Sequence, residues 1–115
     1  MKFQIVLLCL FFLVDLNATP FYFKSYDMED GLSNNHVTCC VQDDYGFMWF
    51  GTRDGLNRFD SKKFYTFKSY SSEKGSLMSS YILDLAKSPT GQIWVSTNLG
   101  LQKYDYQTDS FTLIY

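Results

Sequence analysis

The chain has 115 residues and a formal net charge of −2 at pH 7, so it is at most one small domain. Its basic residues do not cluster beyond the pair Lys62 and Lys63, which argues against a nucleic-acid-binding face. Aromatic residues make up 19% of the chain, far more than disordered segments carry, so the sequence predicts a packed structure.

Residues 1–18 are predicted to be a secretory signal peptide. Lys2 provides a positive start, and the apolar run 5–14 follows it. This run is too short to span a bilayer, which needs about 20 residues, but it fits the hydrophobic region of a signal peptide. Residues 16–18 form an acceptable cleavage site that ends at Ala18. A membrane anchor or a first core strand is the alternative interpretation.

Removing the leader also removes Cys9 and leaves Cys39 and Cys40. Adjacent cysteines pair only through a strained ring, so a structural disulfide between them is not expected. Both fall in an apolar strand pattern, and we predict that they are small buried hydrophobic residues rather than redox or metal groups.

The main feature of the sequence is a segment, residues 44–60, that recurs in residues 90–105 at an offset of 45 (91 − 46 = 45). Glycines, aromatics and turn residues recur together, which is typical of a repeat architecture. The paired positions are Gly46 and Gly91, Trp49 and Trp94, Thr52 and Thr97, Gly55 and Gly100, Leu56 and Leu101, and Asp60 and Asp105.

Each unit is predicted to contain short strands joined by turns. In the first unit we expect strands at 37–42, 47–52, 56–59 and 64–67, with a Gly-containing hairpin turn at 43–46. In the second we expect strands at 82–86, 92–97, 101–104 and 110–115. The loop after Asp105 is two residues longer than the loop after Asp60 (111 − 105 = 6 against 64 − 60 = 4).

The segment 21–26 is also predicted to be extended. Its last part, Phe23-Lys-Ser-Tyr26, recurs as Phe67-Lys-Ser-Tyr70 at the end of the first unit. We therefore predict that it is the last strand of a repeat whose other strands are absent.

Four short antiparallel strands in each 45-residue unit predict the blades of a β-propeller. The expected fold is all-β: an incomplete propeller of about two four-stranded antiparallel blades and an orphan closing strand, preceded by a signal peptide. A β-sandwich is the structural alternative, but sandwiches do not repeat the same Trp and Gly at a fixed interval. The expected division is 1–18 signal peptide, 19–30 closing strand and linker, 31–70 first blade and 71–115 second blade.

The motifs Gly31-Leu-Ser-Asn-Asn35, Gln42-Asp43 and Gly46 through Asp60 resemble the two-component regulator propeller repeat. That repeat is found in the periplasmic sensor regions of Bacteroidetes hybrid two-component systems. The second unit departs from the pattern, because Ser88-Pro89 stands in place of Gln-Asp and Ser96 replaces the Gly of the Trp-x-Gly-Thr motif.

The resemblance implies that the chain is the N-terminal fragment of a periplasmic sensor anchored in the inner membrane. In that family two seven-bladed propellers precede a sandwich domain, a membrane span and a histidine kinase, so kinase activity would lie beyond Tyr115. The family's usual ligands are oligosaccharides, and the full-length protein is expected to be a homodimer. The closing strand would fasten the propeller ring. The alternative is an exported interaction module, or a truncated product without signalling activity.

No catalytic, cofactor or metal site is predicted, and a propeller enzyme lacks a suitable acid/base pair here. His36 is expected to be a solvated or turn-bonding loop residue. The carboxylates Asp43, Asp44, Asp54 and Asp60 are interpreted as turn formers rather than as a Ca²⁺ site. Asp44, Gly46 and Trp49 also suggest the Asp-box hairpin of sialidase-type propellers, but the second unit lacks the Asp.

Trp49 and Trp94 could stack on sugars, but their place in each repeat favours packing between blades. The paired positions of the repeat are thus predicted to be scaffold. Two blades leave open edges and uncovered faces. We therefore expect residues 19–115 alone to be oligomeric or aggregated.

Overall fold

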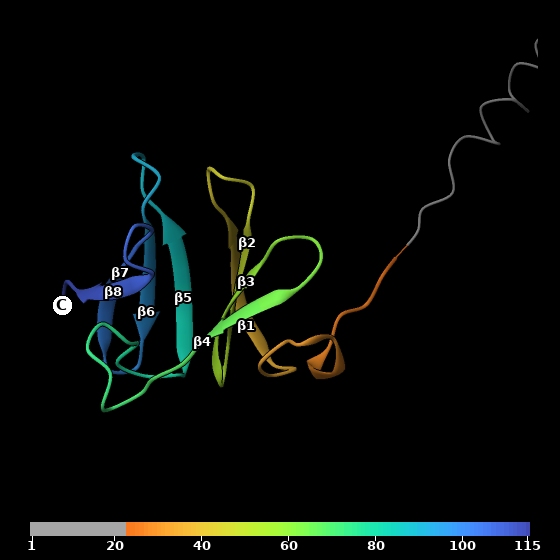
Figure 1. Ribbon diagram of the computed structural model, residues 1–115, viewed down its shortest axis with the longest axis horizontal. Helices are drawn as coiled ribbons and strands as arrows, with labels where there is room; N and C mark the ends of the chain where they lie inside the picture. Colours follow the sequence, from red (N-terminus) through yellow and green to blue (C-terminus); the bar gives the residue numbers. More distant parts are fainter. Residues whose placement is uncertain (1–22) are drawn as a thin grey trace, which may run out of the picture.

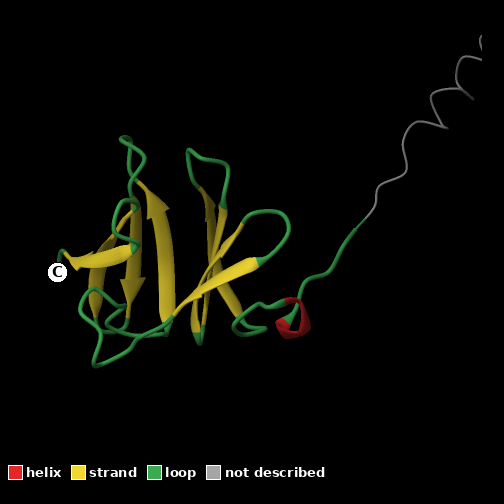
Figure 2. Cartoon of the chain, in the orientation of Figure 1, coloured by secondary structure: helices red, strands yellow, loops and turns green. Residues whose placement is uncertain are grey.

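The structure is a computed structural model that describes residues 23–115. The predicted signal peptide and its cleavage site at Ala18 lie outside these residues. Two four-stranded antiparallel sheets make up the described part of the chain (Figure 1). Almost everything else is loop (Figure 2). A single 3-10 turn, η1 (Met28–Asp30), is the only helical element of residues 23–115, so no helix in that range could cross a membrane.

The first sheet, here called the first blade, contains β1 (Val37–Gln42), β2 (Met48–Thr52), β3 (Gly55–Phe59) and β4 (Phe64–Phe67). The second blade contains β5 (Ile82–Lys87), β6 (Ile93–Thr97), β7 (Gly100–Asp105) and β8 (Ser110–Leu113). In both sheets the strands pair in chain order. The predicted all-β fold with two four-stranded antiparallel blades is confirmed, and the sheets do not close into a ring.

The two blades share one hydrogen-bonding register. The β1–β2 pairing is irregular between Val37 and Cys39, and the β5–β6 pairing is irregular at the equivalent place, between Ile82 and Asp84. In the outer hairpins Phe59 faces Phe64 and Tyr104 faces Phe111. The two residues added after Asp105 are therefore absorbed in the loop, and the strand register is unchanged.

Side chains alternate across each sheet, so every blade has two faces. The front face of a blade is the one directed toward the N-terminal side of the blade pair. The rear face is the one directed toward its C-terminal side. The first blade's front face is Leu32, Val37, Met48, Phe50, Phe59 and Phe64, and the second blade's is Leu77, Ile82, Ile93, Val95, Tyr104 and Phe111. The first blade's rear face is Cys39, Val41, Trp49, Gly51 and Leu56, and the second blade's is Asp84, Ala86, Trp94, Ser96 and Leu101.

The hydrophobic core lies between the blades. β1 and β5 run side by side (Figure 1), and the rear face of the first blade packs against the front face of the second. Trp49, Leu56 and Ile82 have 0% exposure in this interface. We call this interface the blade joint. Because a sheet has only two faces and no interior, most of the apolar burial depends on the contact between blades.

The predicted strand at residues 21–26 is not observed in its described part. Residues 23–27 form no strand, and Phe23 is 95% exposed. A strand needs a partner edge for its backbone groups, and both sheets are already complete with four strands. Tyr26 instead lays its ring against Phe59, with the ring centroids 5.0 Å apart.

Candidate functional site

The blade joint is held by a buried carboxylate at the turn between β1 and β2. Asp43 is 5% exposed, and its Oδ1 accepts the backbone N–H groups of Tyr45 and Phe47, both at 2.9 Å. Its Oδ2 accepts the indole N–H of Trp49 at 2.9 Å and the hydroxyl of Tyr106 at 2.8 Å. A buried charge is tolerated when donors surround it, and such bonds are stronger than neutral ones. One carboxylate therefore fixes the turn, the Trp and the neighbouring blade.

Tyr106 comes from the loop after β7 of the second blade, so its bond to Asp43 crosses the joint. Burial raises the pKa of the Tyr106 hydroxyl, and the adjacent Asp43 carboxylate raises it further, because both disfavour a phenolate. The Trp49 indole stacks on Phe67 at 5.8 Å and meets Tyr104 edge-on at 4.8 Å. The indole is therefore enclosed by aromatic rings from both blades.

A second polar group of the joint is Arg58 on β3, whose side chain is 15% exposed. Its guanidinium lies 5.2 Å from the Tyr65 ring centroid and 5.3 Å from that of Phe47, which is within cation–π range. It donates to the Tyr104 hydroxyl at 2.8 Å and pairs with Asp109 at 3.4 Å. The Tyr104 hydroxyl in turn donates to Asp109. Arg58 thus links the first blade to two residues of the second.

Gly51 sets how closely the blades approach. A Cβ at this position would lie 2.5 Å from the Cys39 Sγ and 2.5 Å from the Ile82 Cγ2, which no real contact allows. The glycine of the Trp-x-Gly-Thr motif is therefore required by the neighbouring strand β5. The second unit has Ser96 here, and no blade covers Ser96 in the described part of the chain.

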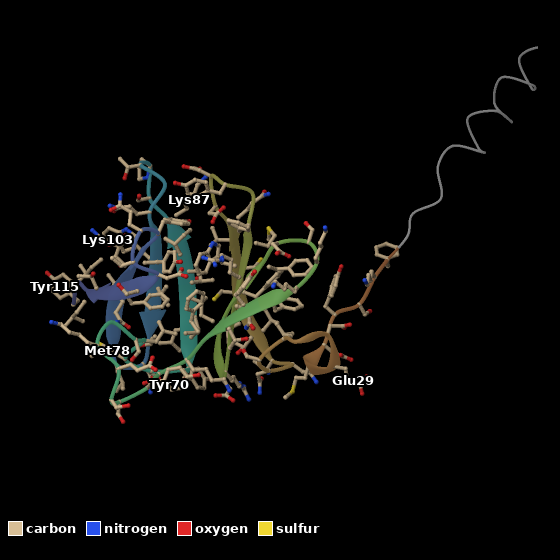
Figure 3. The ribbon with its side chains drawn as sticks, in the orientation of Figure 1. Glu29, Tyr70, Met78, Lys87, Lys103 and Tyr115 are labelled. Atoms are coloured by element: carbon tan, nitrogen blue, oxygen red, sulfur yellow. The ribbon has the colours of Figure 1, made fainter. Side chains whose placement is uncertain are left out.

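The equivalents of these polar groups in the second blade cannot form the same bonds. At the offset of 45, Ser88 stands in place of Asp43 and Lys103 in place of Arg58, so the counterpart of Gln42-Asp43 is Lys87-Ser88 and not the predicted Ser88-Pro89. Lys103 lies on the side of the second blade away from the first (Figure 3). The indole N–H of Trp94 is buried without a hydrogen-bond partner among the described residues. The joint chemistry is therefore present once, on the rear face of the first blade.

The remaining repeat residues lie at turns. Thr52 donates to the Gly55 carbonyl at 2.8 Å and Thr97 to the Gly100 carbonyl at 3.2 Å, so the β2–β3 and β6–β7 turns are built alike. Asp60 accepts the N–H groups of Lys62 and Lys63 at 2.9 Å, and these bonds lower its pKa. Asp105 accepts the N–H of Gln107 at 2.8 Å. Gly46 and Gly91 have φ of 91° and 88°, which favours glycine.

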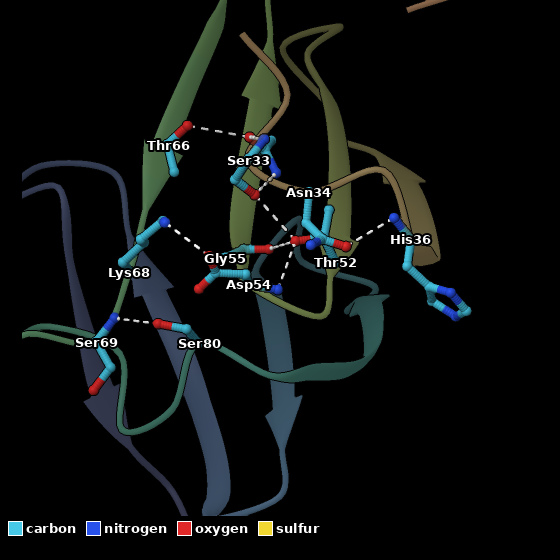
Figure 4. A network of polar contacts seen from close by, with 11 residues as sticks. Ser33, Asn34, His36, Thr52, Asp54, Gly55, Thr66, Lys68, Ser69 and Ser80 are labelled. Atoms are coloured by element: carbon cyan, nitrogen blue, oxygen red, sulfur yellow. Dashed lines mark hydrogen bonds and ion pairs between the residues drawn. The ribbon is translucent and has the colours of Figure 1, made fainter. Parts of the chain in front are cut away.

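A polar network at the β2–β3 end holds the loop that precedes the first blade (Figure 4). Asn57 accepts the N–H of Ser33 at 3.1 Å and donates to its hydroxyl at 2.8 Å. In the second blade Gln102 accepts the N–H of Met78 at 2.8 Å and donates to the Ser76 carbonyl at 3.2 Å. Asn57 and Gln102 were not among the predicted site residues, although the offset of 45 between them (102 − 57) is the signal that would have identified them.

The other candidates take no part in the joint chemistry. The backbone N–H of His36 donates to the Asn34 side chain at 2.8 Å, and the residue is exposed. Cys39 and Cys40 are both free thiols. Burial raises the pKa of the Cys39 thiol. The prediction that both cysteines are buried is wrong for Cys40, which is exposed, and Cys39 is only partly buried. Cys40 points from β1 to the front face of the first blade, which the second blade does not cover.

Within residues 23–115 no group of three or more His, Cys, Asp or Glu side chains is placed to hold a metal ion. Trp49 has 0% exposure and so offers no face to a sugar. Two cavities of about 310 Å³ are present. One is polar and lies between the loops after β4 and β7, where Lys68, Lys74 and Asp109 line it. The other is apolar and covers the front face of the first blade.

This architecture, with one aromatic joint between two four-stranded antiparallel blades, is that of part of a propeller-type domain. The model of the family described as "Two component regulator propeller" matches residues 31–54. The predicted resemblance to the two-component regulator propeller repeat is therefore confirmed for residues 31–54.

Among solved structures, the extracellular domain of a hybrid two component system from B. thetaiotaomicron superposes with a TM-score of 0.73 and 37% identity over 82% of this chain. Two structures of another extracellular domain from that bacterium give TM-scores of 0.66 and 0.65 at 20% and 23% identity, over 84% and 82% of this chain. These two support the fold alone. Among curated proteins, Histidine kinase P4 of Formosa agariphila is 46% identical over 67 residues, or 56% of this chain.

The chain spans only a small part of each of these proteins. It covers 5% of the Formosa histidine kinase and 13%, 14% and 14% of the three extracellular domains. What this chain shares with them is thus a small part of much larger proteins.

Proposed function

We propose that this chain is the first part of the extracytoplasmic sensor of a hybrid two-component system. The observation that carries the proposal is the 37% identity, over 82% of the chain, to an extracellular domain of such a system. Residues 1–18 would direct export to the periplasm. The proposed partners are further propeller blades, a sandwich domain, a membrane span and a histidine kinase of the same protein, which would act as a homodimer held in the inner membrane.

The proposed ligand of the complete sensor is an oligosaccharide. The two blades described here would contribute scaffold and loops rather than catalysis, since their polar groups are engaged in turns and in the blade joint. Support comes from the Asp43 carboxylate, which accepts hydrogen bonds from its own turn, from Trp49 and from Tyr106 of the second blade, and so is not free to act on a substrate. We propose that the two blades bind no metal and no cofactor.

The test uses the whole extracytoplasmic region encoded by the gene. Binding would be measured by isothermal titration calorimetry against a panel of glycan-derived oligosaccharides, with monosaccharides as the matched control. We expect one class of oligosaccharide to bind saturably and to raise the thermal midpoint, because ligands that bind only the folded state stabilise it. A folded region that binds no member of the panel would contradict the carbohydrate ligand.

The second candidate function is an exported interaction module without signalling output. The apolar face of the first blade, where Tyr26, Phe50 and Phe59 lie, would be its contact surface. Reading the DNA that follows codon 115 separates the two proposals. More Trp-x-Gly-Thr repeats followed by a membrane span and a kinase would support the sensor, whereas a stop codon at that point would support the module.

A further inference from the structure

The polar cavity between the two blades has walls that the repeat does not specify. Its volume is about 310 Å³, and residues from 66–76 line one side and 108–111 the other. The paired Gly, Trp, Thr, Leu and Asp positions of the repeat do not line it. Thr108 and Asp109 belong to the loop that is two residues longer in the second unit. Because both walls come from the described blades and the loop that joins them (Figure 1), the cavity does not depend on any further blade.

The wall formed by the loop after β4 is held in place by hydrogen bonds. The Ser76 hydroxyl donates to the Tyr70 carbonyl at 2.9 Å and accepts the Tyr70 N–H at 3.3 Å. The Phe111 N–H donates to the Gly75 carbonyl at 2.8 Å, which ties this loop to β8. A Cβ at Gly75 would lie 2.9 Å from the Cβ of Ser110, so the glycine allows this close approach. A ligand would therefore not have to order the loop, which lowers the cost of binding.

The charged groups that line the cavity balance each other. Lys68 and Lys74 supply two positive charges, and Glu73 and Asp109 supply two negative ones. Lys68 also donates to Asp54 at 3.0 Å, which uses one of the three donors of its ammonium group. A lining with no net charge gives no net attraction to an ion of either sign. It does offer both donors and acceptors to an uncharged ligand.

Hydrogen-bonding capacity remains on these charged groups. The Glu73 and Lys74 side chains are exposed and take part in none of the three ion pairs of the described residues. Asp109 pairs with Arg58 and accepts from Tyr104 through the same oxygen, its Oδ1. Its Oδ2 can therefore accept a hydrogen bond from a ligand.

Hydroxyl groups and aromatic rings complete the lining. The hydroxyl groups belong to Thr66, Ser76, Thr108 and Ser110, and the rings to Phe67, Tyr70 and Phe111. The Tyr70 residue is 50% exposed, so part of its ring is available for stacking. A sugar unit presents hydroxyl groups around an apolar ring face, and it needs this combination of partners. The volume lies at the small end of the range for ligand sites, which suits part of an oligosaccharide.

From these observations we infer that the polar cavity is a subsite for an uncharged sugar unit. Glu73, Lys74 and Asp109 provide hydrogen bonds to its hydroxyl groups, and the Tyr70 ring provides a stacking surface. This inference rests on the proposed sensor function. It adds the position of one subsite and a preference for uncharged sugars.

The test uses the whole extracytoplasmic region encoded by the gene. The cavity pair, Glu73→Ala with Lys74→Ala, removes one charge of each sign from the lining. Glu29→Ala with Lys62→Ala, at exposed positions outside the cavity, is the matched control. Both pairs leave the net charge unchanged. The probes are neutral oligomers of glucose, galactose, mannose and xylose, with oligogalacturonates as the negative counterpart and glucosamine oligomers as the positive one.

Isothermal titration calorimetry gives the first readout. We expect a neutral oligomer to bind and the cavity pair to weaken its affinity about tenfold or more, because hydrogen bonds to charged groups are the stronger ones. The control pair should bind like the parent. Binding of the charged oligomers alone would overturn the preference for uncharged sugars.

Hydrogen exchange on the unmodified region locates the bound oligomer without any variant. Segments 68–76 and 106–111 should both exchange more slowly in the complex, because they form the two walls. Binding that protects neither segment would overturn this inference, and so would a cavity pair that binds like the parent. The proposed sensor function would stand in both of these cases. A folded region that binds none of the oligomers would overturn the sugar subsite and the carbohydrate ligand together.

Discussion

At the scale of single residues, the blade joint depends on one carboxylate with several donors. Asp43 was expected to be a turn former, and it does accept the N–H groups of its own turn. The same side chain also receives Trp49 from β2 and Tyr106 from the second blade. Asp43 is therefore both a turn residue and the polar centre of the otherwise apolar blade joint.

Replacing Asp43 with Asn should destabilise the chain by about 1–3 kcal/mol, the cost of leaving a buried polar group unpaired. The amide keeps one acceptor for the turn, but it lacks the second carboxylate oxygen that accepts the indole N–H of Trp49. Urea denaturation followed by tryptophan fluorescence measures the loss. Ser88→Asn is the matched control at the equivalent turn of the second blade. Equal losses at the two positions would show that only the turn matters.

Because of the Tyr106 hydroxyl, the free energy of unfolding is expected to fall at alkaline pH. Burial and Asp43 raise its pKa above the ordinary 10.0, so the folded state holds the proton more tightly than the unfolded state. The contribution is complete below that ordinary value and is lost as pH rises from it toward the folded pKa. Urea midpoints above pH 10 should fall more steeply for the parent than for Tyr106→Phe. Tyr70→Phe, at an exposed position, should keep the slope of the parent, and an equal slope in all three proteins would contradict this assignment.

At the scale of the elements, the spacing between β2 and β5 is set by the absence of a side chain at Gly51. The Ile82 methyl group occupies the space that a Cβ would need. The first unit therefore needs a glycine at this position, because β5 lies against it; the second unit carries Ser96 at the equivalent position.

Exchanging these two residues tests that explanation. Gly51→Ser should cost about 1–3 kcal/mol, as overpacking of a close contact usually does. Ser96→Gly should change stability much less, because its face is open and only backbone entropy is affected. Thermal unfolding of the two variants measures the difference. Adding Ile82→Ala to Gly51→Ser should recover part of the loss, whereas purely additive effects would show that the two residues do not compete for space.

At the scale of the whole molecule, the strands and the two blades follow from the sequence because glycines and aromatics recur at 45 residues. The residues that contact each other across the blade joint cannot be predicted from this repeat. Tyr106 and Asp109 lie in the loop that is two residues longer in the second unit. The repeat pattern therefore gives no matching residue in the first unit from which their role could be predicted. The exposure of Cys40 and the absence of a strand at 23–26 have the same origin. Both depend on whether a neighbouring sheet is present, and the apolar pattern of a strand does not show which sheet lies beside it.

The position of the core leads to a prediction for the whole chain. Leu77, Ile82 and Ile93 of the second blade are as buried as Trp49 and Leu56 of the first, and each set is buried by the other. A chain that ends at Tyr70 would expose the rear face of its only blade, and a single sheet with no covered face buries too little apolar area to offset its conformational entropy. We therefore expect residues 1–70 to show no cooperative thermal transition by circular dichroism, while the 115-residue chain unfolds in one transition seen equally by tryptophan fluorescence and circular dichroism. Amide exchange gives the independent check, because β2 and β6 should exchange with the same opening free energy if the joint is the core. Lasting protection of β2 in the shorter chain would mean that each blade is stable alone, and the joint would then be only a contact between finished units.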